Sequence, residues 1–175
     1  MFNPNEFKEV AGKVLNFESL PDEGKFRTAI GRYYYYIFLK IREIVKEVEK
    51  DREDGIYGLL NRGTAHRVLP LYFKILAFRI NNGNLRMKFI KLSDELNELR
   101  DKRNVADYQL DSMVDSLIAN DVKNRVEELE QIVDTISYEE PENKTNIVGL
   151  KNVLAYFRDV SPTYNDVINM MYRRR

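Results

Sequence analysis

The 175-residue chain contains no cysteine, which excludes disulfide bonds, thiol nucleophiles, iron–sulfur clusters and zinc sites built on thiolates. Its single histidine, His66, excludes metal sites that need a pair of histidines. The eight glycines are scattered, and neither a G-x-G-x-x-G fingerprint, a phosphate-binding glycine–lysine loop nor a G-x-S-x-G motif is present. The chemistry that remains is that of carboxylates, arginines, tyrosines and one imidazole.

Long uncharged stretches are also missing, since residues 33–39 and 55–61 are the longest without a charged side chain. A membrane span needs about 20 apolar residues, and a secretory signal needs a basic and then apolar N-terminus. The 28 acidic and 28 basic residues balance, so we expect no global attraction to nucleic acid or to an acidic membrane. We therefore expect a soluble, cytoplasmic protein that binds no membrane, cofactor or metal ion.

Helical periodicity dominates the sequence, because apolar residues recur three and four positions apart and no sustained alternation indicates strands. The pattern predicts main helices at about residues 4–17, 19–52, 64–79, 85–108 and 120–136, followed by two short helices near the C-terminus. Asn120 or Asp121 is the expected cap of the fifth helix, and Ser161 before Pro162 that of the last. The predicted fold is an all-α bundle of about five main helices with additional short terminal helices.

We expect a single domain over residues 1–175. Within it, residues 139–147 read as a polar linker and residues 148–175 as a C-terminal helical extension.

One arginine interrupts the apolar stripe of the fourth main helix. The stripe comprises Leu85, Phe89, Leu92, Leu96 and Leu99. The next position is Arg103, where the pattern requires a leucine, and Arg100 lies on the flank of the same face. A buried guanidinium is costly unless it is paired or lines a groove. The alternative is that the helix ends here and Arg103 faces water at its C-terminus.

Three segments together resemble the HEPN family (higher eukaryotes and prokaryotes nucleotide-binding). The run from Arg103 and Asn104 to Asp107 and Tyr108 resembles its signature of an arginine, often followed by asparagine, with a histidine four to six residues further on. Residues 32–38, Arg-Tyr-Tyr-Tyr-Tyr-Ile-Phe, resemble its Arg-Ala-Tyr-Tyr-Ala-x-Phe stretch. His66 resembles a histidine often found at the start of the following helix. The resemblance covers about residues 20–138, the HEPN-like core.

The resemblance implies a homodimer of helical bundles with a groove at the interface. It implies binding of RNA or a nucleotide by Arg100, Arg103 and Asp107, and partners such as a cognate antitoxin or a nucleotidyltransferase. Active members are metal-independent ribonucleases, many of them toxins or antiviral effectors. In their chemistry the RNA 2′-hydroxyl attacks the adjacent phosphate, arginine stabilises the developing charge and histidine moves protons. The catalytic candidates carried over to this chain are Arg103, Asn104, Tyr108 and His66.

This chain departs from the family pattern at Tyr108, which occupies the first position allowed for the histidine. Tyrosine, with an ordinary pKa of about 10, is almost entirely neutral at pH 7 and is a poor general base. Three hypotheses stay open: a HEPN ribonuclease or effector, a catalytically silent HEPN module that binds RNA, nucleotide or a partner, and a helical adaptor with a structural Arg103. We assign Tyr108 a positioning role, as a hydrogen-bond donor to phosphate.

Other residues have competing interpretations. His66 either supplies an imidazole to the Arg103 groove or is a polar residue at a helix start. Of the four consecutive tyrosines at 33–36, we expect two in the core and two partly exposed. The acidic residues at 127, 128, 130 and 134 scatter around their helix, which favours a solvated face over a metal site.

Overall fold

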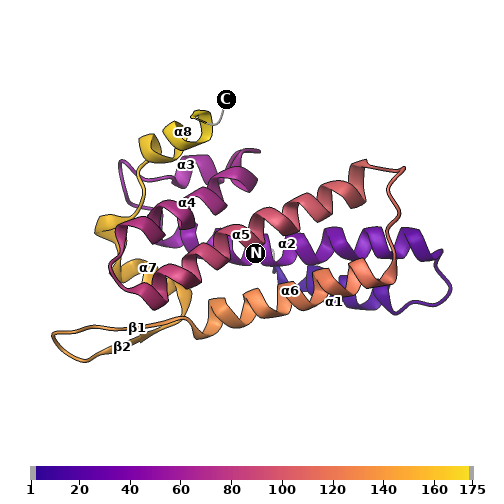
Figure 1. Ribbon diagram of the computed structural model, residues 1–175, viewed down its shortest axis with the longest axis horizontal. Coiled ribbons are helices and arrows are strands. Elements are labelled where there is room, and N and C mark those ends of the chain that lie inside the picture. Colours follow the sequence, from indigo (N-terminus) through magenta and orange to yellow (C-terminus); the bar gives the residue numbers. More distant parts are fainter. Residues whose placement is uncertain (1–2, 174–175) are drawn as a thin grey trace. The chain divides into compact units, whose positions relative to one another are not determined.

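The computed structural model describes residues 3–173 and is an all-α helical bundle, as predicted (Figure 1). The longer helices are α1 (Asn5–Leu15), α2 (Asp22–Glu49), α4 (Ala65–Arg79), α5 (Gly83–Tyr108) and α6 (Ser116–Thr135). The short ones are α3 (Tyr57–Leu60), α7 (Leu150–Tyr156), α8 (Tyr164–Tyr172) and the 3₁₀ turn η1 (Arg158–Val160). Within residues 3–173, no helix combines the length and the apolarity that crossing a bilayer requires.

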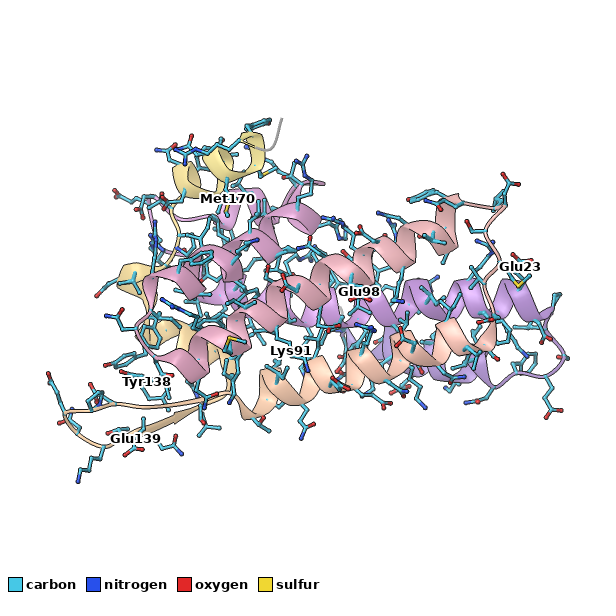
Figure 2. The ribbon with its side chains drawn as sticks, viewed as in Figure 1. Glu23, Lys91, Glu98, Tyr138, Glu139 and Met170 are labelled. Carbon is cyan, nitrogen blue, oxygen red and sulfur yellow. The ribbon has the colours of Figure 1, made fainter. Side chains whose placement is uncertain are left out.

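Two short strands were not predicted. β1 (Ser137–Glu139) and β2 (Asn146–Val148) pair antiparallel and form a hairpin that extends from the end of α6 (Figure 1). Figure 2 labels Tyr138 and Glu139 on this hairpin. Strands of three residues are too short to show an alternating pattern, so the sequence suggested only a polar linker at this point.

Two predicted helix caps are wrong. α6 begins at Ser116 rather than near Asn120 or Asp121, because the Asp115 carboxylate accepts a hydrogen bond from the Ile118 amide at 2.9 Å. α8 begins after Thr163, which forms a capping box with Asp166, rather than after Ser161. Ser161 is instead buried, and its hydroxyl lies 3.1 Å from that of Tyr72.

The described chain divides into two compact units. The first comprises residues up to Lys40 together with Glu98–Glu130, and the second comprises Ile41–Asn97 and the residues from Gln131 onward. Helices α2, α5 and α6 each contribute residues to both units.

Apolar stripes of the long helices form the core, as their periodicity predicted. The five stripe residues of α5 are each at most 1% exposed, which leaves Arg103 as the next position on a fully buried seam. Three of the four consecutive tyrosines, Tyr33, Tyr34 and Tyr36, are buried and only Tyr35 is half-buried. The expectation of two core tyrosines was therefore wrong.

In the second unit, the carboxylate of Glu49 is fully buried among polar partners. It lies 3.1 Å from the Arg52 guanidinium and accepts a hydrogen bond from the Tyr72 hydroxyl at 3.0 Å. Burial raises the pKa of Glu49, against the opposing effect of Arg52. Arg52 also donates to the Ser161 carbonyl at 3.2 Å, so this cluster fixes the segment before α8.

In the first unit, Glu130 of α6 holds both α1 and α2. Lys8 of α1 and the Tyr36 hydroxyl of α2 donate hydrogen bonds to its carboxylate, and Lys40 of α2 lies 3.4 Å away. Burial alone would raise the pKa of Glu130, but the hydrogen bonds from Lys8 and Tyr36 outweigh it and the pKa is lowered. Glu130 is thus an ionised residue that links α1, α2 and α6.

Replacing this carboxylate should make the unit less stable in a pH-dependent way. Because the folded pKa lies below the unfolded one, Glu130 stabilises the fold above about pH 4.3 and this contribution is lost as the pH falls further. We expect Glu130→Gln to lower the free energy of unfolding by about 1–3 kcal/mol at pH 7. Urea denaturation should show that the difference in free energy of unfolding between the wild type and Glu130→Gln decreases below about pH 4.

The matched control is Glu9→Gln. Glu9 is exposed on α1 and pairs with no basic side chain among the described residues. If both variants lower the free energy of unfolding equally at pH 7, the contacts of the Glu130 carboxylate contribute nothing specific to stability.

Candidate functional site

Arg103 is packed into the first unit near the end of α5, and its side chain is only 14% exposed. Its Nη2 donates a hydrogen bond to the Tyr35 hydroxyl, and its Nη1 donates to the Asn104 side-chain oxygen at 3.1 Å. Its Nε lies 2.7 Å from an oxygen of Asp107, as an ion pair whose angle does not make a hydrogen bond. The alternative of a helix end with Arg103 facing water is therefore wrong, since α5 continues to Tyr108.

Two aromatic rings contact the same guanidinium. Its central carbon lies 5.1 Å from the ring centre of Tyr35 and 5.2 Å from that of Tyr108. Tyr35 is half-buried, whereas Tyr108 is 69% exposed. Such contacts favour a cation over a ring face. Arg103, Tyr35, Asn104, Asp107 and Tyr108 form the Arg103 cluster, and the exposed Tyr108 ring brings one side of it to the surface.

The surroundings keep Arg103 charged. Burial alone would lower its pKa, but Tyr35, Asp107 and Tyr108 raise it further than burial lowers it. Burial also raises the pKa of the neighbouring Tyr34 well above the usual tyrosine value, although Arg100 and Arg103 oppose this shift. The site therefore presents a permanent cation beside a neutral phenol at Tyr34.

The structure brings four predicted site residues together: Arg103, Asn104, Asp107 and Tyr108. Arg100 lies one turn earlier on α5, close enough to influence Tyr34, and its guanidinium is 3.3 Å from the Asp101 carboxylate. His66 is half-buried near the start of α4, in the second unit, and its participation stays a prediction. The first unit itself contains no histidine.

Arg27, which binds the end of α5, was not predicted from the sequence. Its guanidinium donates hydrogen bonds to five backbone carbonyls, those of Val105, Ala106, Gln109, Leu110 and Ser112, at 2.6–3.4 Å. Glu23, labelled near the beginning of α2 in Figure 2, accepts two further bonds from Arg27 at 2.7 and 3.0 Å. The Glu23–Arg27 spacing of four residues was the only signal in the sequence.

A small hollow borders the cluster. It measures about 260 Å³ and is lined by Thr28, Gly31, Arg32, Tyr35 and Asp107. Tyr35 and Asp107 also contact Arg103, so the hollow and the Arg103 cluster share one wall.

Comparison with known proteins identifies relatives of this chain. A protein of Methanocaldococcus jannaschii named "Uncharacterized protein MJ0992" is 55% identical to this chain over the whole length of both. The chain belongs to the family of that protein. "Uncharacterized protein MJ0628", of the same organism, is 34% identical over 117 residues, which are 64% of this chain and 66% of that protein. No family model and no solved structure matches.

Removing hydrogen bonds between Arg27 and the carbonyls at the end of α5 should lower the stability of this segment. Arg27→Lys keeps the charge but removes the planar fork that reaches several carbonyls at once. We expect a loss of about 2–3 kcal/mol in the free energy of unfolding, together with faster amide hydrogen exchange at residues 105–112. Arg62→Lys, at an exposed position of the second unit, is the control. Unchanged exchange in this segment would contradict the assignment.

Proposed function

We propose that this chain is a HEPN-type, RNA-associated protein that binds RNA at the Arg103 cluster. The observation that carries the proposal is a packed, permanently charged arginine in contact with an exposed aromatic ring, at the position where the HEPN resemblance has its arginine. Proteins bind single-stranded RNA with this combination, because arginine contacts the phosphate and the ring stacks on a base.

The residues favour binding over cleavage. Cleavage through the 2′-hydroxyl needs a group that moves protons near pH 7, and the first unit offers only carboxylates and phenols beside Arg103. In the proposed complex Arg103 contacts phosphate, Asn104 holds the guanidinium through its side-chain oxygen, and Tyr108 positions the RNA. We further propose that the protein acts as a homodimer in the cytoplasm, with the two clusters facing one groove.

Removing the Arg103 guanidinium should weaken RNA binding strongly. A hydrogen-bonded contact between opposite charges contributes about 1.5–3 kcal/mol, so we expect Arg103→Ala to raise the dissociation constant about 10- to 100-fold. The measurement is fluorescence anisotropy with a single-stranded oligouridylate in EDTA, alongside light scattering to determine the oligomeric state. Arg67→Ala, an exposed arginine of the second unit, removes the same charge and should have little effect.

The same samples decide between binding and cleavage. Intact RNA after long incubation supports the binding module. Cleavage in EDTA that leaves a cyclic phosphate and requires Arg103 would instead establish a metal-independent ribonuclease. Equal binding by wild type and Arg103→Ala would refute the proposal.

Substitutions of Tyr108 test its positioning role. Tyr108→Phe keeps the ring and should weaken binding about two- to threefold, whereas Tyr108→Ala also removes stacking, worth about 1–3 kcal/mol. Tyr108→His should raise any cleavage, because it adds a group that titrates near pH 7. Tyr108 is exposed, so circular dichroism should show an unchanged fold in all three. If Tyr108→Phe is as damaging as Arg103→Ala, the tyrosine takes part in catalysis and its assignment to a positioning role is wrong.

A further inference from the structure

Arg32 is a cation of the first unit that the proposed site does not use. It is exposed on α2, and among the residues that the structure describes it forms no ion pair with a carboxylate. Its guanidinium instead contacts the ring of Phe7 in α1, at 5.2 Å from the guanidinium carbon to the ring centre. A guanidinium that packs on a ring and forms no ion pair with a carboxylate can donate hydrogen bonds to an external anion.

Arg32 lines two hollows of different character. The hollow beside the Arg103 cluster also contains Asp107 and Tyr35. The other, of about 250 Å³, is formed by Glu6, Phe7 and Val10 with Arg32. Arg32 therefore lines both a polar hollow and a hollow with an apolar wall.

A continuous row of rings and guanidinium groups joins Arg32 to the proposed site. Phe7 lies 6.0 Å from Tyr35 between ring centres, with the planes inclined by 32°. Tyr35 then contacts Arg103, and Arg103 contacts Tyr108. The row thus combines cationic and aromatic groups over residues from α1, α2 and α5, and each end carries an exposed residue, Arg32 and Tyr108.

The chemistry of the hollows fits a nucleotide better than a simple anion. Glu6 and Asp107 each line a hollow together with Arg32, and their carboxylates repel a free inorganic anion. A ribonucleotide matches all the groups at once. Its phosphate can contact Arg32, its 2′-hydroxyl and the N3–H of a uracil base can donate to the carboxylates, and its base has a flat face for Phe7.

We propose that Arg32 and Phe7 form a second nucleotide subsite, which binds the phosphate and base of a single-stranded RNA whose neighbouring nucleotides lie at Arg103 and Tyr108. The inference rests on the proposed RNA binding and deepens it by giving the RNA a path across the first unit. The subsite lies outside the segment from Arg103 to Tyr108, although Arg32 begins the HEPN-like stretch of residues 32–38, and its two residues come from α1 and α2.

The salt dependence of RNA binding distinguishes the charge contact of Arg32 from the stacking contact of Phe7. For single strands, each phosphate contact contributes about 0.7 to the slope of log affinity against log salt. We expect Arg32→Ala to weaken binding of an oligouridylate of about 12 nucleotides roughly tenfold and to reduce the slope by about 0.7. Arg32→Lys should keep the slope. Phe7→Leu should weaken binding roughly tenfold with the slope unchanged, because it removes stacking and no charge.

The controls separate failure of the subsite from failure of RNA binding itself. Arg67→Ala carries the same change of charge in the second unit and should leave affinity and slope as in the wild type. If Arg103→Ala weakens binding while Arg32→Ala changes neither affinity nor slope, the subsite is refuted and the RNA-binding proposal stands. Equal losses in Arg32→Ala and Arg67→Ala also refute it, since they indicate a general charge effect. If the wild type binds no RNA, both proposals fall.

Discussion

The first unit depends on the contact between the Arg27 guanidinium and the carbonyls at the end of α5. The last carbonyls of a helix have no partner within it, and leaving them unpaired where the chain packs is costly. A cation at this end also complements the helix dipole. Because Arg27 belongs to α2, one side chain both ends α5 and ties it to α2 at the level of Asp107 and Tyr108. Glu23 holds Arg27 in place through two bonds.

This anchoring explains how Arg103 can interrupt a buried seam. Guanidinium is more weakly hydrated than ammonium, its flat faces pack on rings and its edges donate several hydrogen bonds. The Tyr35 hydroxyl accepts a hydrogen bond from one edge of the guanidinium, and the Tyr35 ring contacts the guanidinium. The Asn104 side-chain oxygen accepts a hydrogen bond from another edge, and the Asp107 carboxylate balances the charge. A lysine could not make these contacts together, so the surroundings are built for arginine. A side chain held on so many sides is oriented before any ligand arrives, which reduces the entropy lost on binding.

Local periodicity accounts for the features that could be predicted from the sequence. The helical fold, the α5 stripe and the anomaly of Arg103 all depend on spacing of three and four residues, which the helix geometry converts directly into a buried face. Arg27 could not be found this way, because its acceptors are backbone groups about 80 positions away, and every residue type has a carbonyl. The third buried tyrosine was missed because α2 is covered on more than one side, which one helical stripe does not reveal.

The ion pair between Asp107 and Arg103 has consequences for which anions the site can accept. The side chain of Asp107 is about one-third exposed, and pairs of this kind contribute about 1 kcal/mol or less. A phosphate contacting the same guanidinium contributes about 1.5–3 kcal/mol, so it can displace or share the arginine with Asp107. A small monovalent anion gains less and also meets the repulsion of the carboxylate. In the RNA complex that we propose, Asp107 would therefore compete with the phosphate for Arg103, which favours ligands that make several simultaneous contacts. The single-stranded RNA that we propose would contact Tyr108, Arg103 and Arg32 together, and each further contact adds to the affinity once the first has fixed the RNA in place.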